Sequence, residues 1–277
     1  MRLCSPPPAT TLSPNFKKAK DPTVKLKNQI AIITGGGGVL GGAVARKLAA
    51  EGAKIVLFDI RAEFAGKNAE SVAALGGEAE AVGLDITDAE AVRRAVDDLH
   101  VRHGRIDILV NCAGGSARGR MKVFHEQSLD VVRDVIGVNL FGTLNCIHAV
   151  ARHMVAAKSG KIVNVGSAVA VQGLARCVDY AASKGAILSA TKSLAKELGP
   201  LGINVNCVSP GQIPREQPAD PEAFALHHSF LNRIGTPDDI AHLVHYLVLP
   251  EASFIVGQNY IVDGGRTLAM QGSDIRD

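Results

Sequence analysis

The feature that most constrains the fold is a regular alternation of short apolar segments with longer amphipathic ones, starting at residue 28. The short segments are continuous runs rich in Val and Ile, which is typical of strands buried on both faces. Strict strand–helix alternation predicts an α/β fold: a parallel sheet covered by helices on both faces, three layers in all. The predicted strands are 29–34, 54–59, 80–84, 106–111, 161–167, 203–209 and 259–262, and the predicted helices 40–51, 62–75, 88–103, 128–157, 178–199 and 236–248.

The charge distribution divides the chain into a short tail and one long domain. Residues 1–27 contain six of the 30 basic residues and one of the 27 acidic ones, so the remainder carries 24 bases and 26 acids. We interpret residues 1–24 as a disordered, basic, Pro-rich extension and residues 25–277 as a single domain, because no linker-like segment interrupts them. A nearly neutral domain is poor evidence for nucleic-acid binding, and we expect no nucleic-acid partner.

The cysteines and the apolar runs indicate the compartment. Five widely spaced cysteines without a C-x-x-C pair are typical of a reducing environment, which favours a cytoplasmic location. No apolar run approaches the ~18–20 residues that cross a bilayer, so we expect no membrane association. Residues 1–24 lack the apolar core of a secretory signal, although their scarcity of acids leaves an organelle transit peptide as an alternative. The nine histidines form no recognised metal pattern, and we expect no metal.

A glycine-rich turn follows the first predicted strand and precedes the first predicted helix. Glycines let the backbone approach a pyrophosphate, and a helix N-terminus offers free N–H groups and a favourable dipole. A merely flexible turn is the alternative, but the position between strand and helix favours dinucleotide binding. The residues of this turn that we expect to contact the cofactor are Gly35, Gly37, Gly38, Val39, Leu40 and Gly41.

Asp59 ends the second predicted strand, where a carboxylate can accept hydrogen bonds from the adenosine ribose hydroxyls and repel a 2′-phosphate. This position favours NAD over NADP, and we place Asp59 and its neighbour Ile60 at the cofactor. Arg61 is the contrary indication, since an arginine can hold a 2′-phosphate. A solvated acid at the end of a strand is the alternative interpretation of Asp59.

Tyr180 and Lys184 lie four residues apart at the start of the helix after the fifth predicted strand, and therefore share one helix face. An ammonium near a phenol favours the phenolate and lowers a pKa that starts near 10. Such a phenol can give or take the proton of an alcohol. Ser167 ends the preceding strand, where its hydroxyl could bind the same substrate oxygen.

Taken together, these motifs resemble the short-chain dehydrogenase/reductase family over about residues 26–267. The residues that carry the resemblance are Thr34-Gly35 with Gly41, Asp59, Asp85, Asn111 to Gly114, Asn139, Ser167, Tyr180 with Lys184, Pro210-Gly211, and Asp263 to Gly265. The resemblance implies a Rossmann-like fold with a seven-stranded parallel sheet and an active site of Ser, Tyr, Lys and Asn.

The resemblance also implies roles. Tyr180 would be the general acid/base, Ser167 would orient and polarise the substrate oxygen, and Lys184 would bind the nicotinamide ribose and lower the pKa of Tyr180. Asn139 would hold a water in a proton relay through Lys184. The further cofactor contacts that it implies are Asp85 and Ile86 at the adenine, Asn111, Ala113 and Gly114 along the cofactor, and Pro210, Gly211 and Ile213 after the sixth strand.

Two positions depart from the family pattern. Val39 stands where the family has a glycine, and Gly38 comes one place early. Pro214 stands where the family often has a threonine that meets the nicotinamide carboxamide, and it has neither a hydroxyl nor an N–H. We therefore expect the backbone of Ile213 to serve that contact.

These features predict an NAD-dependent oxidoreductase that moves a hydride between the cofactor and a hydroxyl or carbonyl group of a small alcohol or ketone. A non-catalytic nucleotide-sensing or scaffold protein on the same fold is the alternative. An epimerase or dehydratase is a third, less favoured possibility. Because helices 128–157 and 178–199 are more apolar than solvated helices need to be, and similar proteins pair such helices, we expect a homotetramer.

The segment 212–230 is expected to act as a lid over the site, because it follows the sixth strand and places apolar side chains at the spacing of a short helix. Arg118 and Arg176 come from two other loops at the same edge of the sheet. Together they could clamp an anionic group of the substrate, with both arginines in solvent as the alternative.

Overall fold

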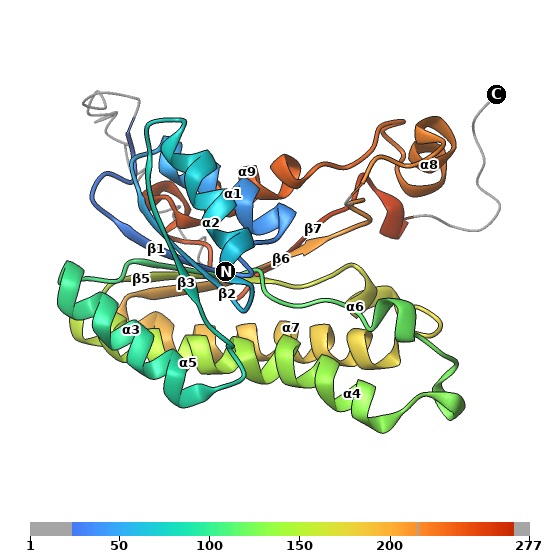
Figure 1. Ribbon diagram of the computed structural model, residues 1–277, viewed down its shortest axis with the longest axis horizontal. Helices are drawn as coiled ribbons and strands as arrows, with labels where there is room; N and C mark the ends of the chain where they lie inside the picture. Colours follow the sequence, from blue (N-terminus) through green and yellow to red (C-terminus); the bar gives the residue numbers. More distant parts are fainter. Residues whose placement is uncertain (1–23, 215, 269–277) are drawn as a thin grey trace, which may run out of the picture.

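The computed structural model describes residues 24–214 and 216–268, which form a three-layer α/β fold (Figure 1). Seven strands make one sheet in the order β3-β2-β1-β4-β5-β6-β7, and all neighbouring strands are parallel. The predicted fold class is confirmed. The predicted N-terminal extension lies, apart from residue 24, outside the described residues.

All seven predicted strands are present. Their bounds are β1 Ile30–Thr34, β2 Lys54–Asp59, β3 Glu78–Gly83, β4 Ile108–Asn111, β5 Gly160–Val165, β6 Ile203–Pro210 and β7 Asn259–Val262. β5 ends two residues earlier than predicted, so Ser167 lies in the loop beyond the strand. The helices are α1 Val39–Ala50, α2 Ala62–Ala73, α3 Ala89–His103, α4 Leu129–Ile136, α5 Thr143–Ala157, α6 Val169–Gln172, α7 Val178–Leu198, α8 Pro221–His228 and α9 Pro237–Val248.

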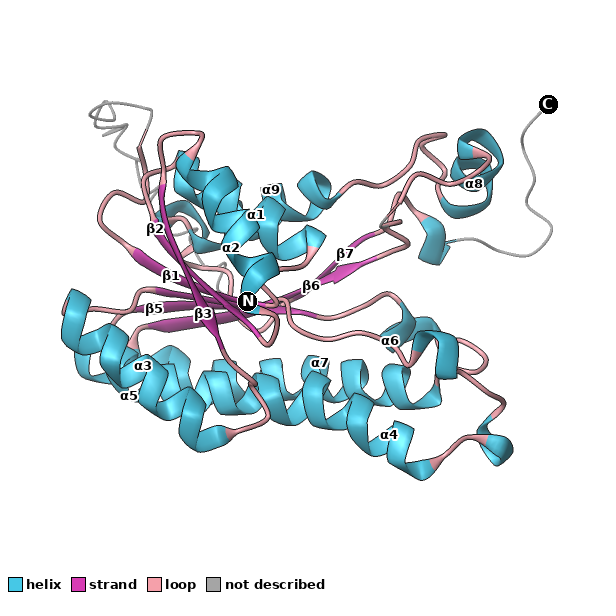
Figure 2. Ribbon diagram, in the orientation of Figure 1, coloured by secondary structure: helices cyan, strands magenta, loops and turns pink. Residues whose placement is uncertain are grey.

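Two helical layers enclose the sheet (Figure 2). One layer contains α1, α2 and α9, and the other contains α3, α5 and α7, with α4 at one end. Successive side chains of a strand point to opposite faces, so Ile33 of β1 packs in the core with Val44 of α1, while Ile32 packs in the other core with Met154 of α5. This two-sided burial explains the continuous apolar runs of the sequence.

The predicted helix 128–157 is interrupted, and this corrects the sequence interpretation. A π-helical segment, Gly137–Gly142, separates α4 from α5. Inside it, the Asn139 carbonyl accepts a hydrogen bond from the Thr143 hydroxyl at 2.8 Å. π-Helical turns of this kind are often found at functional sites. Apolar periodicity continues through the segment, which is why the sequence pattern did not reveal it.

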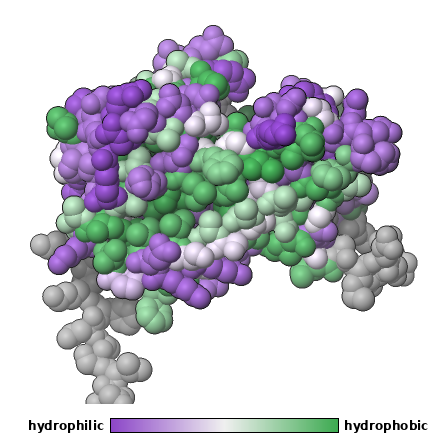
Figure 3. Space-filling view, turned by 90° about the horizontal axis from the view of Figure 1, so that it is seen from below, coloured by the Kyte–Doolittle hydropathy of each residue, from purple (hydrophilic) through white to green (hydrophobic). Residues whose placement is uncertain are grey.

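By length and composition alone, the stretch Leu129–Ala157 is apolar enough to cross a membrane, with a mean hydropathy of 1.3. Here α5 packs against α3, β4 and β5, and α4 packs against α7. The same layer leaves apolar side chains exposed, and apolar colour gathers on this face of the molecule (Figure 3). The exposed apolar residues of this segment and of the start of α7 are Leu129, Val138, Phe141 and Val178.

Beneath the carboxyl edge of the sheet, a buried chain of polar side chains joins two strands to α7. The Asn111 amide donates to the Asn164 carbonyl oxygen at 2.9 Å, and the Asn164 amide donates to the Thr191 hydroxyl at 3.0 Å. Thr191 in turn donates to the backbone oxygen of Ile187. Asn111, Asn164 and Thr191 are all buried, so each bond replaces contact with water. This chain holds β4, β5 and α7 in register below the site.

We expect Asn164→Ala to lower the free energy of unfolding by about 2–4 kcal/mol, because it leaves the amide of Asn111 without its acceptor in the interior and opens a cavity. Asn204→Ala is the control: this half-buried side chain donates to the backbone oxygens of Ser253 and Ile255 and accepts from the Lys161 ammonium, nearer to solvent. That variant should lose only about 1 kcal/mol. Urea unfolding followed by circular dichroism measures both, and equal losses would contradict the proposed importance of the buried chain.

Candidate active site

A cavity of about 520 Å³ opens at the carboxyl ends of the strands. Its position follows from the sheet order: the chain leaves β1 toward β2 and β3 on one side and later resumes at β4 on the other, which leaves a crevice where the direction reverses. The predicted site residues that line it are Gly35, Gly38, Val39, Leu40, Gly41, Asp59, Ile60, Asp85, Ile86, Ala113, Gly114, Ser167, Tyr180, Lys184, Pro210, Gly211 and Ile213. Gly37, Asn111 and Asn139 were also predicted at the site, and they do not line the cavity.

The glycine turn closes on itself despite its departure from the family spacing. Gly35 adopts a φ of +66°, a conformation that glycine allows, and its carbonyl accepts a hydrogen bond from the Gly38 N–H at 2.9 Å. A Cβ on Gly41 would overlap the same carbonyl oxygen. Gly38 is the extended residue that precedes α1, and Val39 is the first residue of the helix, half exposed toward the cavity. The extra glycine therefore provides the cap, and the turn needs no glycine at position 39.

The Asn68 side chain of α2 holds this turn from behind. Its amide donates to the backbone oxygens of Gly36 and Gly38, at 2.7 and 3.2 Å. No sequence motif indicates this contact, because Asn68 lies in the middle of a predicted helix. The bond leaves the N-terminus of α1 facing the cavity, with N–H groups that a helix cannot satisfy internally.

Asp59 lines the cavity and also accepts a hydrogen bond from the glycine turn. One carboxylate oxygen accepts from the Gly37 N–H at 2.9 Å, and the other accepts from the Arg61 N–H at 2.9 Å. This contact explains why Gly37 lies behind the cavity wall. A carboxylate offers about four acceptor positions, so two remain for hydroxyl groups. The Arg61 guanidinium stacks over the Phe64 ring, 4.3 Å from its centroid.

At the next strand end, Asp85 and Ile86 form the neighbouring wall of the cavity. One oxygen of Asp85 accepts hydrogen bonds from the N–H and the hydroxyl of Thr87, at 2.9 and 2.8 Å. The Ile86 side chain packs against Gly142, where a Cβ would collide with it. The end of the π-helical segment is thus fitted to this wall.

Ser167, Tyr180 and Lys184 meet at the opposite end of the cavity from Asp59 and Asp85. Ser167 follows β5, and the other two lie on the first turns of α7. The Lys184 ammonium donates to the backbone oxygen of Val165 at 2.7 Å. Ala117, Val131 and Val135 form a small apolar cluster against the Tyr180 ring. All three residues line one cavity, as the spacing argument expected, and their catalytic roles stay predictions.

The electrostatics differ from the expectation that Lys184 lowers the pKa of Tyr180. Burial raises the pKa of Tyr180, and a hydrogen bond to Ser167 and the charge of Arg118 lower it by less. Burial also lowers the pKa of Lys184 to about 8. Without a bound cofactor, the burial of Tyr180 therefore outweighs the groups that favour its charged form.

Asn139 lies behind the cavity wall and fixes it. Its side-chain oxygen accepts from the Gly115 N–H at 2.8 Å, and its amide donates to the Gly115 oxygen and to the Ser183 hydroxyl. A Cβ on Gly114 would overlap this side chain, so Gly114 is required for the close approach. Asn139 thereby ties the loop after β4 to α7, next to Tyr180 and Lys184.

Some residues of the cavity wall could not be predicted from the sequence, because loop residues carry no periodic signal. Pro214 and Ile213 line the cavity as expected, and Arg118 does so while Arg176 does not. Cys112 lines it too, and burial raises the pKa of its thiol to about 12, which keeps it protonated. Lining residues that no motif indicated include Gln172, Leu174, Gln212, Pro237 and Arg266. Within residues 24–214 and 216–268, no three His, Cys, Asp or Glu side chains gather as a metal site would need.

The predicted lid contains the short helix α8, as its spacing suggested. Arg233 anchors the C-terminal side of this segment through a paired ion bridge to Asp239, at 2.7 and 2.8 Å. Asp239 also accepts from Thr236 and completes the capping box of α9. Closure of the segment over the site stays a prediction.

Comparison with known proteins places this geometry among related enzymes. A family model described as enoyl-(acyl carrier protein) reductase matches residues 38–267. The chain is 37% identical to the short-chain reductase protein NovJ of Streptomyces niveus, over 87% of this chain and 94% of that protein. It is also 37% identical to galactitol 2-dehydrogenase of Agrobacterium fabrum, over 89% of this chain and all of that protein. A crystal structure of NAD⁺-bound xylitol dehydrogenase is 31% identical and superimposes with a TM-score of 0.81, covering 87% of this chain and 100% of that one.

The lowered pKa of the buried Lys184 ammonium predicts that stability depends on pH. The pKa of Lys184 is about 8 in the folded protein and 10.5 in an unfolded chain, so between these values the unfolded chain binds more protons and stability rises with pH. We expect the difference in unfolding free energy between the wild type and Lys184→Met to shift by about 2 kcal/mol in favour of the wild type as the pH rises from 7.5 to 9.5. Lys192→Met, at an exposed lysine of α7, is the control for loss of one charge. Chemical denaturation at each pH measures the difference, and a constant difference for Lys184→Met would contradict the lowered pKa.

Proposed function

The chain belongs to the short-chain dehydrogenase/reductase family of oxidoreductases, and on that premise we propose that it interconverts a small alcohol and its ketone with NAD(H), using Tyr180 as general acid/base. The observation that carries the proposal is the convergence of Ser167, Tyr180 and Lys184 at one end of a cavity whose other end holds the glycine turn and Asp59. A non-catalytic sensor would not need these three groups together.

The cavity fits a dinucleotide cofactor. Its volume is within the range of ligand sites, the N-terminus of α1 faces it across the glycine turn, and Asp59 retains acceptor capacity at the far wall. The glycine turn and α1 would hold the pyrophosphate, Asp59 the adenosine ribose, and Asp85 with Ile86 the adenine. The bound nicotinamide supplies the carbon that accepts or gives the hydride.

The side chains of this chain would handle the proton. A substrate hydroxyl between Ser167 and Tyr180 would donate its proton to the Tyr180 oxygen during oxidation, and Ser167 would hold the developing carbonyl oxygen in place. Lys184, fixed by the Val165 carbonyl, would keep a positive charge next to the phenolate. Asn139 would position the Gly114–Gly115 loop and α7 around them; its proposed role in a water relay rests on the family resemblance.

We propose NAD as the preferred cofactor. Asp59 presents a carboxylate where a 2′-phosphate would lie, and two backbone N–H groups fix its orientation. Arg61 is stacked on Phe64 and close to Asp59, which partly neutralises it as a phosphate ligand. The NAD⁺-bound state of the related xylitol dehydrogenase supports the same preference.

The substrate class is proposed from the site and from relatives. Relatives include galactitol 2-dehydrogenase and a cyclohexanol dehydrogenase of Acinetobacter, which is 33% identical over 88% of this chain. A small secondary alcohol is consistent with the cavity between Tyr180 and the lid segment. We further propose a homotetramer, supported by the exposed apolar face of the α4–α5 and α7 layer, and a cytoplasmic location, supported by the four free cysteines that the structure describes.

Tyr180→Phe should lower kcat by roughly 10²–10⁴-fold while NADH binding and folding stay close to wild type, because only the proton donor is removed. Tyr246→Phe, on the exposed side of α9 and outside the cavity, is the matched control and should keep full activity. Steady-state oxidation of a panel of secondary alcohols provides the measurement. A Tyr180→Phe enzyme with more than half of the wild-type kcat would refute the assignment.

NADH should bind at least tenfold more tightly than NADPH, about 1.4 kcal/mol, because of repulsion between Asp59 and the 2′-phosphate. Asp59→Asn should reduce this ratio mainly by strengthening NADPH binding, whereas Asp98→Asn, at an exposed acid of α3 outside the cavity, should leave it unchanged. Titration of both cofactors by nicotinamide fluorescence measures the ratios. Equal binding of the two cofactors to the wild type would show that Arg61 governs the preference.

A further inference from the structure

The charged groups of the cavity are distributed unevenly. Its two acids, Asp59 and Asp85, both lie at the strand ends on the β2–β3 side of the sheet. The other half of the cavity contains Tyr180, Lys184 and two arginines, Arg118 and Arg266, and no acid among its described lining residues. Any substrate that reaches Tyr180 therefore enters a region of positive charge.

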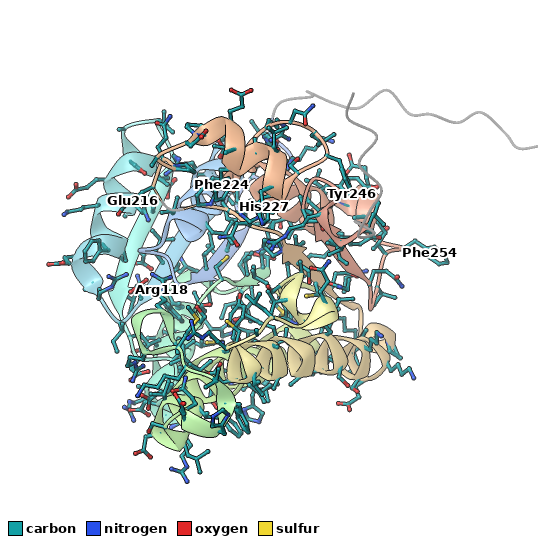
Figure 4. All side chains as sticks on the ribbon, turned by 90° about the vertical axis from the view of Figure 1, so that its right-hand side faces the viewer. Arg118, Glu216, Phe224, His227, Tyr246 and Phe254 are labelled. Carbon is teal, nitrogen blue, oxygen red and sulfur yellow. The ribbon has the colours of Figure 1, made fainter. Side chains whose placement is uncertain are left out.

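Arg118 lines the same half of the cavity as Tyr180. The preceding residue, Ala117, belongs to the small apolar cluster against which Tyr180 packs, and the Arg118 charge is close enough to act on the pKa of Tyr180. One guanidinium nitrogen lies 3.8 Å from the position of a Cβ on Gly115, the residue held by Asn139. The side chain thus turns back over the loop after β4 toward the cavity. Figure 4, which looks at this end of the molecule, shows Arg118 below the α8 segment that carries Phe224 and His227.

The guanidinium of Arg118 has no anionic partner in the part of the chain that the structure describes. Its neighbour Arg120 pairs with Asp134 at 3.1 Å, and Arg61, which lines the other half of the cavity, lies beside Asp59. Lys184 also has its acceptor, the Val165 carbonyl. Among the cations near Tyr180, Arg118 keeps all its donors available for a ligand, and a guanidinium presents them as a planar fork that matches a carboxylate.

The backbone at this residue is unusual. Arg118 has a φ of +49°, a left-handed conformation that costs a non-glycine residue free energy. It begins a short 3-10 turn, Arg118–Arg120, at the rim of the cavity. Arg176 shares this conformation with a φ of +65°, so it is the position of Arg118 on the cavity wall, and not its backbone, that distinguishes the two arginines.

From this geometry we propose that Arg118 binds a carboxylate of the substrate, so that the preferred substrate is a hydroxy acid and its product the corresponding keto acid. The inference rests on the proposed function of the same site. The carboxylate takes no part in the bond changes: the carbinol carbon loses a hydride to NAD⁺ and its hydroxyl proton goes to Tyr180, giving the ketone and NADH. Because Arg118 follows the apolar cluster against which Tyr180 packs, the carboxylate lies near the carbinol carbon.

The structure also changes which arginine accompanies Arg118 at the cavity. Arg176 was predicted to complete a clamp with Arg118, but it does not line the cavity. Arg266, after β7, lines the cavity and is the second cation of this half. Arg176 is exposed and comes from a loop at the same edge of the sheet, which makes it a matched control for loss of one nearby positive charge.

The test uses pairs of substrates that differ only in charge: 3-hydroxybutanoate with 3-hydroxybutanamide, and mandelate with mandelamide. The readout is the ratio of kcat/KM for the acid to that for the amide. We expect the ratio to exceed ten in the wild type for the better pair, to fall at least tenfold in Arg118→Gln, and to fall less in Arg118→Lys. It should stay unchanged in Arg176→Gln. A change in the pKa of Tyr180 would affect acid and amide alike and would leave the ratio constant.

Binding provides a second readout that needs no turnover. Acetoacetate and acetoacetamide are titrated into the NADH complexes of Tyr180→Phe and of the double variant Tyr180→Phe/Arg118→Gln, which lack the proton donor and so do not consume the NADH. NADH fluorescence follows binding, and the acid is expected to bind at least tenfold more tightly than the amide to the first variant but not to the second. Oxidation of cyclohexanol without preference for any acid, or equal binding of acid and amide, would overturn the carboxylate proposal and leave the oxidoreductase function intact. Failure to bind NADH and to oxidise any alcohol would instead overturn the proposed function, and the carboxylate proposal with it.

Discussion

The pairing of β1 with both β2 and β4 is the constraint on which the rest of the structure depends. It sends the chain to opposite halves of the sheet before and after β4 and leaves a crevice at their carboxyl ends. The functional groups at that edge are the glycine turn after β1, Asp59 at the end of β2, the Gly114–Gly115 loop after β4 and Ser167 after β5. The buried polar chain from Asn111 to α7 then brings Tyr180 to the same edge. A parallel sheet with this strand order therefore fixes where chemistry can occur before any side chain is considered.

The strands and the principal site residues could be predicted because their signals are local. Apolar runs mark buried strands, a glycine cluster between strand and helix marks a turn, and a Tyr and a Lys four residues apart share a helix face whatever surrounds them. What the sequence could not supply depends on neighbours from elsewhere in the chain. Asn139 lies behind the cavity wall because a π-helical segment turns it toward Gly115 and Ser183. The apolar periodicity of the sequence does not reveal the extra residue in that helical turn. The pKa of Tyr180 depends on how deeply the ring is buried, which no spacing reveals.

The conformation of loops also depends on tertiary contacts and is even harder to predict from local sequence patterns. Arg118 and Arg176 were equivalent in the sequence, since each follows a strand at the same edge, yet only Arg118 reaches the cavity. The difference arises from packing: Arg118 follows Ala117, a buried member of the cluster against which Tyr180 packs, whereas Arg176 ends an exposed loop. No motif indicates a role for Arg266, which follows the last strand. Substrate recognition is thus encoded in segments whose conformation is determined by tertiary contacts, while cofactor binding is encoded in segments with recognisable local patterns.

The two hydrogen bonds accepted by Asp59 have a consequence for how such proteins change cofactor. The carboxylate that would discriminate against a 2′-phosphate also receives the Gly37 N–H and so helps to shape the turn that would hold the pyrophosphate. Replacing it by a neutral or basic residue alters selectivity and turn geometry in one step. An evolutionary path to NADP would therefore pass through intermediates with a loosened turn unless a second substitution, near Asn68 or Gly37, restored its support. Cofactor preference in this protein is a property of the turn as a unit, and single exchanges at its charged position carry a structural cost.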